Sequence, residues 1–241
     1  MFERPHHQHI AAVLAHLNSD LLCENRCLFG GGTAIALAFG EYRESVDIDF
    51  MCDDKDGYRR LRSLVDQSGL AWAFSPEVKL EREPRVDQYG IRSAVSMGGA
   101  RPIKFEIVFE SRITLDAPRP EERICGVWRL TDVDLVASKL MANADRWRDD
   151  SVMSRDLIDL AMMSPDPAVM AAGRAKAELA YGSSVANSFV KAKTELLERS
   201  NRLRICMQGM GMTLSETELR RAVTRLDIDP PARRATRGVR R

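Results

Sequence analysis

One short stretch near the start of the chain restricts its fold more than any other feature. The apolar run Cys27–Phe29 ends in Gly30–Gly32, and a helical pattern follows. Residues 46–51 then alternate between apolar and polar side chains, which is typical of a strand with one buried face. The sequence therefore predicts the order strand, glycine turn, helix and strand, with Asp47 and Asp49 sharing the polar face of the second strand.

Apolar periodicity divides the rest of the chain into a mixed half and a helical half. Further strands are predicted at residues 70–74, 77–80, 89–97 and 103–109. Helices are predicted at residues 8–22, 56–69, 131–141, 154–163, 168–180, 184–203 and 215–226, with no strand after residue 130. The fold class is therefore α+β. We expect an α/β domain with a mixed sheet at 1–125, a helical domain at 126–229 and a basic, disordered tail at 230–241.

Composition excludes several classes of protein. Hydrophobic residues make up 44% and charged residues 29%, as in ordinary globular chains, and the net charge of +1 gives no overall nucleic-acid signal. Five scattered cysteines are typical of free thiols in a reducing compartment. There is no signal peptide and no apolar run of ~18 residues, so we expect a cytoplasmic protein with no membrane partner.

Both ends of the chain carry a compositional bias. The histidines His6, His7 and His9 could bind a metal, but a mobile polar N-terminus is the preferred interpretation. The tail contains five arginines and no acid, so it could steer RNA electrostatically or simply solubilise the chain; they are Arg233, Arg234, Arg237, Arg240 and Arg241.

The pair Asp47 and Asp49 carries the chemistry. Two carboxylates on one face of a strand repel each other unless a cation lies between them. Mg²⁺ (or Mn²⁺) suits this position, because it binds one or two protein carboxylates together with substrate phosphates. Taken alone, the pattern would more often mark a solvated strand face. The glycine turn changes that balance, because its backbone N–H groups and the helix that follows can hold phosphate.

A third acid, Glu106, lies on the polar face of the strand predicted at 103–109. If that strand neighbours the strand of Asp47 and Asp49, three carboxylates converge and could hold two metal ions ~3.5–4 Å apart. Glu110 falls on the same side, nearer the end of the strand.

These motifs resemble the AbiEii-type nucleotidyltransferase toxins of the DNA polymerase β-like nucleotidyltransferase superfamily. The matching elements are Gly31-Gly32-Thr33-Ala34, then Arg43-Glu44-Ser45-Val46-Asp47-Ile48-Asp49-Phe50, and later Lys139 followed by Arg155-Asp156-Leu157-Ile158-Asp159-Leu160. The resemblance covers residues 28–163 in patches and implies a polymerase β-like mixed-sheet domain followed by helices.

The resemblance also implies roles for individual residues. Gly31, Gly32 and Thr33 would hold a triphosphate, and Asp47, Asp49 and Glu106 would bind metal, with Glu106 as a possible general base. Lys139 would neutralise phosphate charge, and Asp156 would contact the nucleotide or support the site. Arg43 and Ser45 are predicted to bind nucleotide, or else to brace the loop before the strand. The alternative for Arg155, Asp156 and Asp159 is a set of ordinary surface ion pairs.

The predicted function is metal-dependent transfer of a nucleotide from a nucleoside triphosphate to a hydroxyl group. RNA, particularly tRNA, or a protein would be the acceptor, and an antitoxin protein would be a partner. Two alternatives remain open. One is a catalytically silent nucleotide- or RNA-binding module partnered by an antitoxin. The other is a small-molecule nucleotidyltransferase of the aminoglycoside type.

Overall fold

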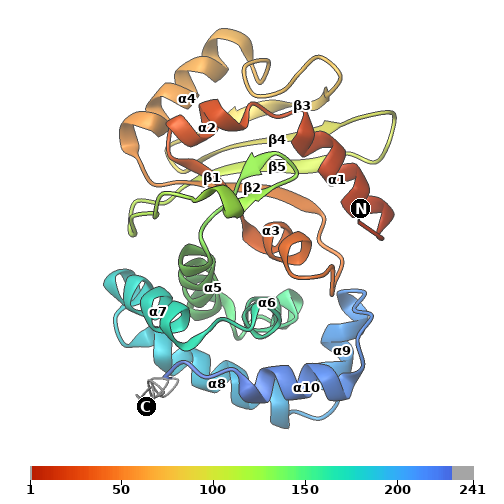
Figure 1. Ribbon diagram of the computed structural model, residues 1–241, viewed down its shortest axis with the longest axis vertical. Coiled ribbons are helices and arrows are strands. Elements are labelled where there is room, and N and C mark those ends of the chain that lie inside the picture. The colour runs from red at the N-terminus through yellow and green to blue at the C-terminus, as the bar shows by residue number, and fades with distance from the viewer. Residues whose placement is uncertain (1, 230–241) are drawn as a thin grey trace, which may run out of the picture.

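The computed structural model describes residues 2–229, which form a sheet half and a helical half stacked on one another (Figure 1). The five-stranded sheet has the order β1-β2-β5-β4-β3. Its strands are β1 (Cys27–Gly30), β2 (Asp47–Cys52), β3 (Lys79–Val86), β4 (Gly90–Ser96) and β5 (Ile103–Phe109). Only β2 and β5 pair in parallel, and the other three pairings are antiparallel. The sheet is therefore mixed, as predicted.

Helices cover the apolar face of this sheet. They are α1 (Pro5–Ala15), α2 (Ser19–Glu24) and α4 (Lys55–Ser68). Ile10 and Val13 of α1 and Leu61 of α4 share one core with Phe50 and Phe105 of the central strands. Every second residue of β2 and β5 enters this core, so the remaining residues of the two strands face the other way.

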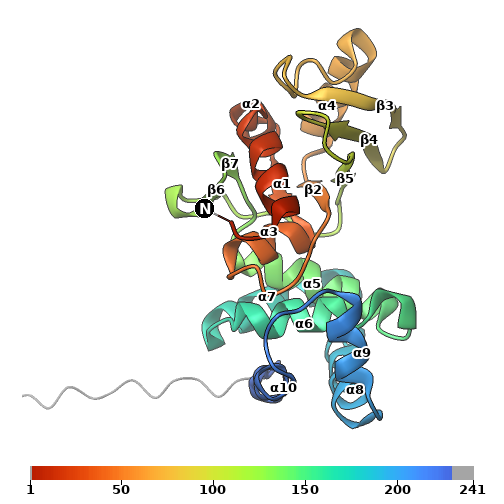
Figure 2. The same ribbon diagram turned by 90° about the vertical axis from the view of Figure 1, so that its right-hand side faces the viewer.

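The other face of the sheet looks toward the helical half. That half contains α5 (Asp132–Arg146), α6 (Arg155–Met163), α7 (Pro167–Tyr181), α8 (Ser184–Glu198), α9 (Arg202–Gly209) and α10 (Glu216–Arg225). The glycine-turn helix α3 (Gly31–Ala38) lies between the two halves (Figures 1 and 2). Ala34 of α3 packs into the sheet core, whereas Ile35 packs into the helical core. The helix α3 therefore joins both halves.

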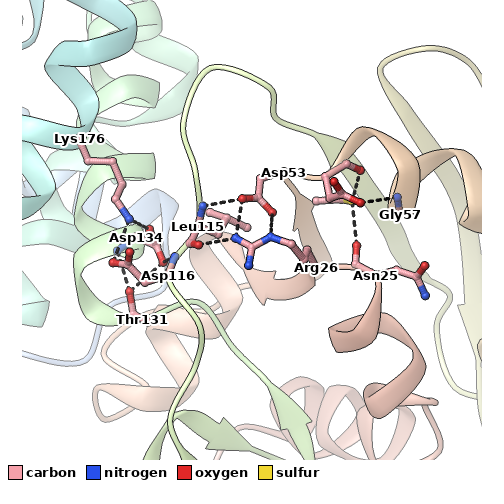
Figure 3. A network of polar contacts seen from close by, with 11 residues as sticks. Asn25, Arg26, Asp53, Gly57, Leu115, Asp116, Thr131, Asp134 and Lys176 are labelled. Carbon is pink, nitrogen blue, oxygen red and sulfur yellow. Dashed lines mark hydrogen bonds and ion pairs between the residues drawn. The ribbon is translucent and has the colours of Figure 1, made fainter.

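Polar networks connect the halves along the segment between β5 and α5 (Figure 3). Arg26 and the backbone N–H of Leu115 both donate to Asp53, with donor–acceptor distances of 2.7–2.8 Å. Farther along, Asp134 on α5 accepts from Lys176 of α7 at 2.5 Å and from the Asp116 backbone at 2.9 Å. Burial raises the pKa of Asp134, while the charge of Lys176 opposes that rise.

Several predicted elements differ from the structure. Residues 70–74 form turns rather than a strand, and the helix predicted at 8–22 is two helices, α1 and α2. The helix predicted at 184–203 breaks into α8 and α9 at Asn201, whose φ is 60°. Ser154, at the predicted start of the helix at 154–163, precedes α6 with a φ of 53°, and its side chain makes no capping hydrogen bond. The strand predicted at 77–80 continues to Val86 in β3, and the helix predicted at 131–141 continues to Arg146 in α5. The remaining strands and helices lie within a few residues of their predicted positions.

Two further observations concern the predicted organisation. A short hairpin, β6 (Arg123–Ile124) and β7 (Val127–Trp128), lies at the predicted boundary near residue 126. Within residues 2–229, no helix combines the length and the apolar character needed to cross a bilayer. The arginine-rich tail at 230–241 lies outside the described residues.

Candidate active site

A cavity of about 520 Å³ opens between the sheet and the helical half. The sheet half contributes the glycine turn, the loop before β2 and the outward side chains of β2 and β5. The helical half contributes α5, the start of α6 and the end of α9. The principal polar lining residues are Arg43, Ser45, Asp47, Asp49, Lys104, Glu106, Lys139, Arg146 and Asp156. Most of the predicted site residues therefore meet in one place.

The predicted acids converge through the strand pairing. Asp49 and Glu106 are direct partners in the parallel β2–β5 register, and Asp47 pairs with Lys104 one row away. Burial, together with the negative charge of Asp47, raises the pKa of Asp49 to about 6. The charge of Glu106 adds to this effect, whereas Lys104 opposes it. Asp49 therefore sits where a cation would relieve an electrostatic cost.

Glu106 already has two cationic partners. Its carboxylate accepts from Arg92 Nε at 2.6 Å and from Lys104 Nζ at 2.5 Å. Burial alone would raise the pKa of Glu106, but Lys104 and Arg92 outweigh burial and hold that pKa below its ordinary value. Glu106 is thus ionised but neutralised by protein side chains. Glu110, the other candidate, is paired with Arg112 and does not line the cavity.

The donor set can be compared with the needs of a metal ion. Among residues 2–229, no group of three or more His, Cys, Asp and Glu side chains is arranged to hold a metal. Asp47 and Asp49 alone still fit Mg²⁺, which takes one or two carboxylates and completes its shell with phosphate and water oxygens. Binding of metal by Glu106 would require it to release Lys104 or Arg92, so the two-metal arrangement stays a prediction.

Close contacts explain the two glycines at the cavity wall. Gly31 has a φ of 69°, and a Cβ there would lie 2.6 Å from Asp49 Oδ2. A Cβ on Gly32 would clash with the guanidinium of Arg43. The glycines therefore allow the turn to lie directly against a carboxylate on one side and a guanidinium on the other.

Thr33 and Ser45 are bonded to one another, and of the two only Ser45 lines the cavity. Thr33 is fully buried, does not line the cavity and donates to Ser45 Oγ at 2.8 Å. The backbone N–H of Ser45 donates to His7 Nε2 at 3.1 Å. These contacts favour the bracing alternative for Ser45 and give Thr33 the same role. His7 belongs to helix α1 and is buried, so the expectation of a mobile N-terminus is wrong.

Lys139, Arg43, Asp156 and Asp159 belong to one chain of buried ion pairs. Lys139 Nζ lies 3.0 Å from Asp156 Oδ1 and 2.6 Å from Asp159 Oδ2. Arg43 pairs with Asp159 at 2.7 Å, and Arg146 pairs with Asp156 at 2.7 Å. The two aspartates are 2% and 0% exposed, so the alternative of surface ion pairs is wrong for them.

The charges of this cluster do not cancel. Three cations, on Arg43, Lys139 and Arg146, face two carboxylates, on Asp156 and Asp159. Burial opposes ionisation of both aspartates, but the neighbouring cations hold the pKa of each below its ordinary value. This cluster, which joins Arg43 of the loop before β2 to side chains of α5 and α6, therefore carries an excess of one positive charge.

Sequence reasoning missed several side chains of the site. Arg146 follows Lys139 by seven residues on α5, a spacing that places both on one helix face. Lys104 shares the polar face of β5 with Glu106, so its position could have been recognised from the alternation. Arg92 and His7 come from elements whose neighbours the pattern does not reveal.

Comparisons with known proteins place this geometry in a family. The family model described as "Nucleotidyl transferase AbiEii toxin, Type IV TA system" matches residues 12–232. No curated protein sequence gives a significant match to the chain.

Two solved structures from Helicobacter pylori are similar to the chain. JHP933 has a TM-score of 0.53 at 17% identity, covering 92% of this chain and 90% of that one. A second protein, provisionally described as a nucleotidyltransferase, gives 0.49 at 16% identity, covering 90% and 89%. The likeness to JHP933 shows a shared fold. Because the family match extends over most of the sequence, this chain is a nucleotidyltransferase of the AbiEii toxin family of type IV toxin–antitoxin systems.

Proposed function

We propose that the protein transfers a nucleoside monophosphate from a nucleoside triphosphate to a hydroxyl group, with Mg²⁺ or Mn²⁺ held by Asp47 and Asp49. The observation that carries this proposal is that Asp47 and Asp49 line one cavity with the Gly31 turn, with Asp49 directly against Gly31. They share a cavity of about 520 Å³ with the ion-pair cluster of Arg43, Lys139 and Arg146, which carries one excess positive charge. A polyphosphate with a divalent cation complements both sets of charges.

Different residues of the cavity have different roles in the proposed reaction. The backbone of Gly31 and Gly32, at the N-terminus of α3, receives the triphosphate. Lys139 and Arg146 on the opposite wall lower the negative charge that the phosphates present to an attacking oxygen. A divalent cation on Asp47 and Asp49 would supply further neutralisation of the developing charge. The protein thus contributes position and charge rather than a covalent intermediate.

Bond changes in the proposed transfer are as follows. The acceptor oxygen forms a bond to the α-phosphorus, and the bond from that phosphorus to the bridging oxygen of the β-phosphate breaks. Pyrophosphate leaves with the electrons of that bond. The acceptor proton passes to Glu106 or to solvent, and the ion pairs of Glu106 with Arg92 and Lys104 make it a weak base.

The acceptor proposed here is RNA, including tRNA, in preference to a small molecule. Support comes from two rows of paired residues that run across the strands on the open face of the sheet. In the first row, the neighbouring strands β2, β5, β4 and β3 place side by side Asp49, Glu106, Arg92 and Arg85. In the second row, the same four strands place side by side Asp47, Lys104, Ala94 and Arg82. Arg82 and Arg85 are exposed, and within residues 2–229 neither joins an ion pair. Such a basic track fits a phosphodiester backbone.

Transfer can be tested with each nucleoside triphosphate labelled at the α-phosphate, incubated with the protein and total RNA or total protein. We expect label in RNA, lost in the Asp47→Asn/Asp49→Asn variant and retained in Asp56→Asn, an exposed carboxylate outside the cavity. Label in protein alone, or in an aminoglycoside alone, would favour those acceptors. Triphosphate binding that is insensitive to chelator, with no transfer to any acceptor, would support the silent binding module.

The basic track has its own test. Replacing Arg82 and Arg85 by Gln should weaken the use of RNA and reduce the salt slope of binding by about one for each lost phosphate contact. Binding of the triphosphate itself should stay unchanged. An antitoxin protein is proposed as partner from the family description, and growth arrest on expression, relieved by a neighbouring gene product, would support it.

A further inference from the structure

His7 joins the N-terminal helix to the loop that leads into the active-site strand. It is 0% exposed, although it precedes the segment that matches the family model, residues 12–232. Its Nδ1 lies 2.7 Å from Glu41 Oε1, and its Nε2 lies 3.1 Å from the backbone nitrogen of Ser45. One imidazole ring therefore contacts both ends of the loop 41–45.

The partners of His7 define its protonation state. The backbone nitrogen of Ser45 is a donor, so Nε2 of His7 must carry a lone pair and Nδ1 must carry the proton. The Nδ1–H group then donates to Glu41, whose carboxylate also accepts from the backbone nitrogens of Glu3 and Arg4. Burial and the charges of Arg4 and His6 lower the pKa of His7, while Glu41 opposes them. Neutral His7 thus satisfies the Ser45 N–H.

Ser45 is the point where three elements meet. Its N–H bonds to His7 of α1, and its hydroxyl accepts from Thr33 of α3. The metal-binding strand begins two residues later, at Asp47. No other anchor holds the backbone of Ser45 among the described hydrogen bonds of residues 2–229. A displacement of Ser45 would therefore carry Asp47 with it.

We propose that His7 is a positioning residue, which holds Asp47 and Asp49 in register with the Gly31 turn by accepting the Ser45 N–H bond. The N-terminal residues outside the family match then form part of the active site of this chain. The kinetic part of the proposal depends on the proposed nucleotide transfer, but the structural part does not.

A matched pair of variants, His7→Gln and His7→Met, isolates the acceptor. The two side chains have nearly the same length, but only Gln offers an oxygen to the Ser45 N–H. The His7→Met variant should exchange the Ser45 amide hydrogen roughly 10-fold faster than the wild type, because its buried donor has lost its partner. The His7→Gln variant should keep the protection. Equal protection in both variants would overturn the proposal.

Transfer kinetics give the second readout. A small displacement of reacting groups can cost about 100-fold in rate. We therefore expect kcat to fall roughly 10- to 100-fold in His7→Met and to recover to within about threefold of the wild type in His7→Gln. Val13→Ala, a core change on the same helix, controls for loss of stability. If Val13→Ala lowered kcat as much as His7→Met at equal melting temperature, the positioning role would be refuted.

The two readouts separate failure of this proposal from failure of the proposed function. A wild type with no transfer activity would refute the function, while faster exchange of Ser45 in His7→Met would still establish the anchor. Active wild type with unaltered Ser45 exchange and unaltered kcat in His7→Met would leave the function standing and refute the role of His7.

Discussion

The Asp49→Asn substitution should stabilise the metal-free protein while it abolishes activity. In the wild type, burial and the neighbouring carboxylates raise the pKa of Asp49 to about 6 from an ordinary value of 3.8. The folded protein therefore binds a proton at Asp49 more tightly than the unfolded chain does. Above pH 6 the ionised carboxylate destabilises the fold, and this cost disappears as the pH falls below about 4. Asn resembles the protonated carboxyl and removes the cost.

The magnitude follows from the two pKa values. Each pH unit between them corresponds to about 1.4 kcal/mol, so the ionised form of Asp49 costs at most about 3 kcal/mol at pH 8. For a chain of this size, 1 kcal/mol shifts the melting temperature by roughly 2–4 °C. The Asp49→Asn variant should then melt up to about 10 °C higher than the wild type at pH 8 and at nearly the same temperature at pH 4.

Thermal melts in chelator at pH 8 and pH 4 measure this difference directly. Asp53→Asn is the matched control, because it removes a carboxylate paired with Arg26 and should lower the melting temperature at pH 8. Mg²⁺ at 100 times its Kd should add about 2.7 kcal/mol to the wild type and much less to Asp49→Asn. A gain in Asp49→Asn that is absent at pH 8, or equal at both pH values, would refute the electrostatic reasoning.

Three other substitutions probe the fold around the cavity. Gly31→Ala should keep the fold but reduce transfer strongly, since its Cβ would lie 2.6 Å from Asp49 Oδ2 at a φ of 69°; paired melting and activity assays check this. Asp159→Asn should cost about 3–5 kcal/mol in urea unfolding, because it leaves buried Arg43 without its anion and Lys139 with Asp156 alone. The fold lowers the pKa of Asp159, so ionised Asp159 contributes to the free energy of unfolding. This contribution should be present above about pH 4, the pKa of Asp in the unfolded chain, and should be lost as the pH falls. Lys176→Met should destabilise the fold by about 1–3 kcal/mol through its partner Asp134, an effect that urea unfolding at pH 7 would measure.

Periodicity in the sequence predicted the strands that carry the acids and the faces they share. Alternation alone placed Asp47 and Asp49 together, and it put Glu106 on the polar face of its strand. It could not assign ion-pair partners, because Arg92 comes from a strand whose neighbour is set by the topology of the whole sheet. The pairing of Arg43 with Asp159 joins positions 116 residues apart, which no local pattern encodes.

The sequence correctly predicted that the second half of the chain is helical, but it did not predict every helix boundary. Apolar periodicity continues through the break between α8 and α9, where Asn201 has a φ of 60°, so periodicity alone does not reveal the end of α8. The prediction for His7 was wrong for a related reason. A polar residue near the N-terminus reads as exposed unless its buried partners, Glu41 and Ser45, are known.

The site depends on packing across the predicted division at residue 125, which itself stays a prediction. Arg43 in the loop before β2 is fixed by Asp159 of α6, and Leu28 and Ile35 of the glycine-turn region pack into the helical core. The backbone of Glu44 donates to Met210 O, so the end of α9 also holds this loop (Figure 1). The glycine turn is therefore positioned from both sides. Because Asp49 comes from the sheet half and Lys139 from the helical half, a change in the angle between the halves would alter the distance between them and hence the binding of a triphosphate.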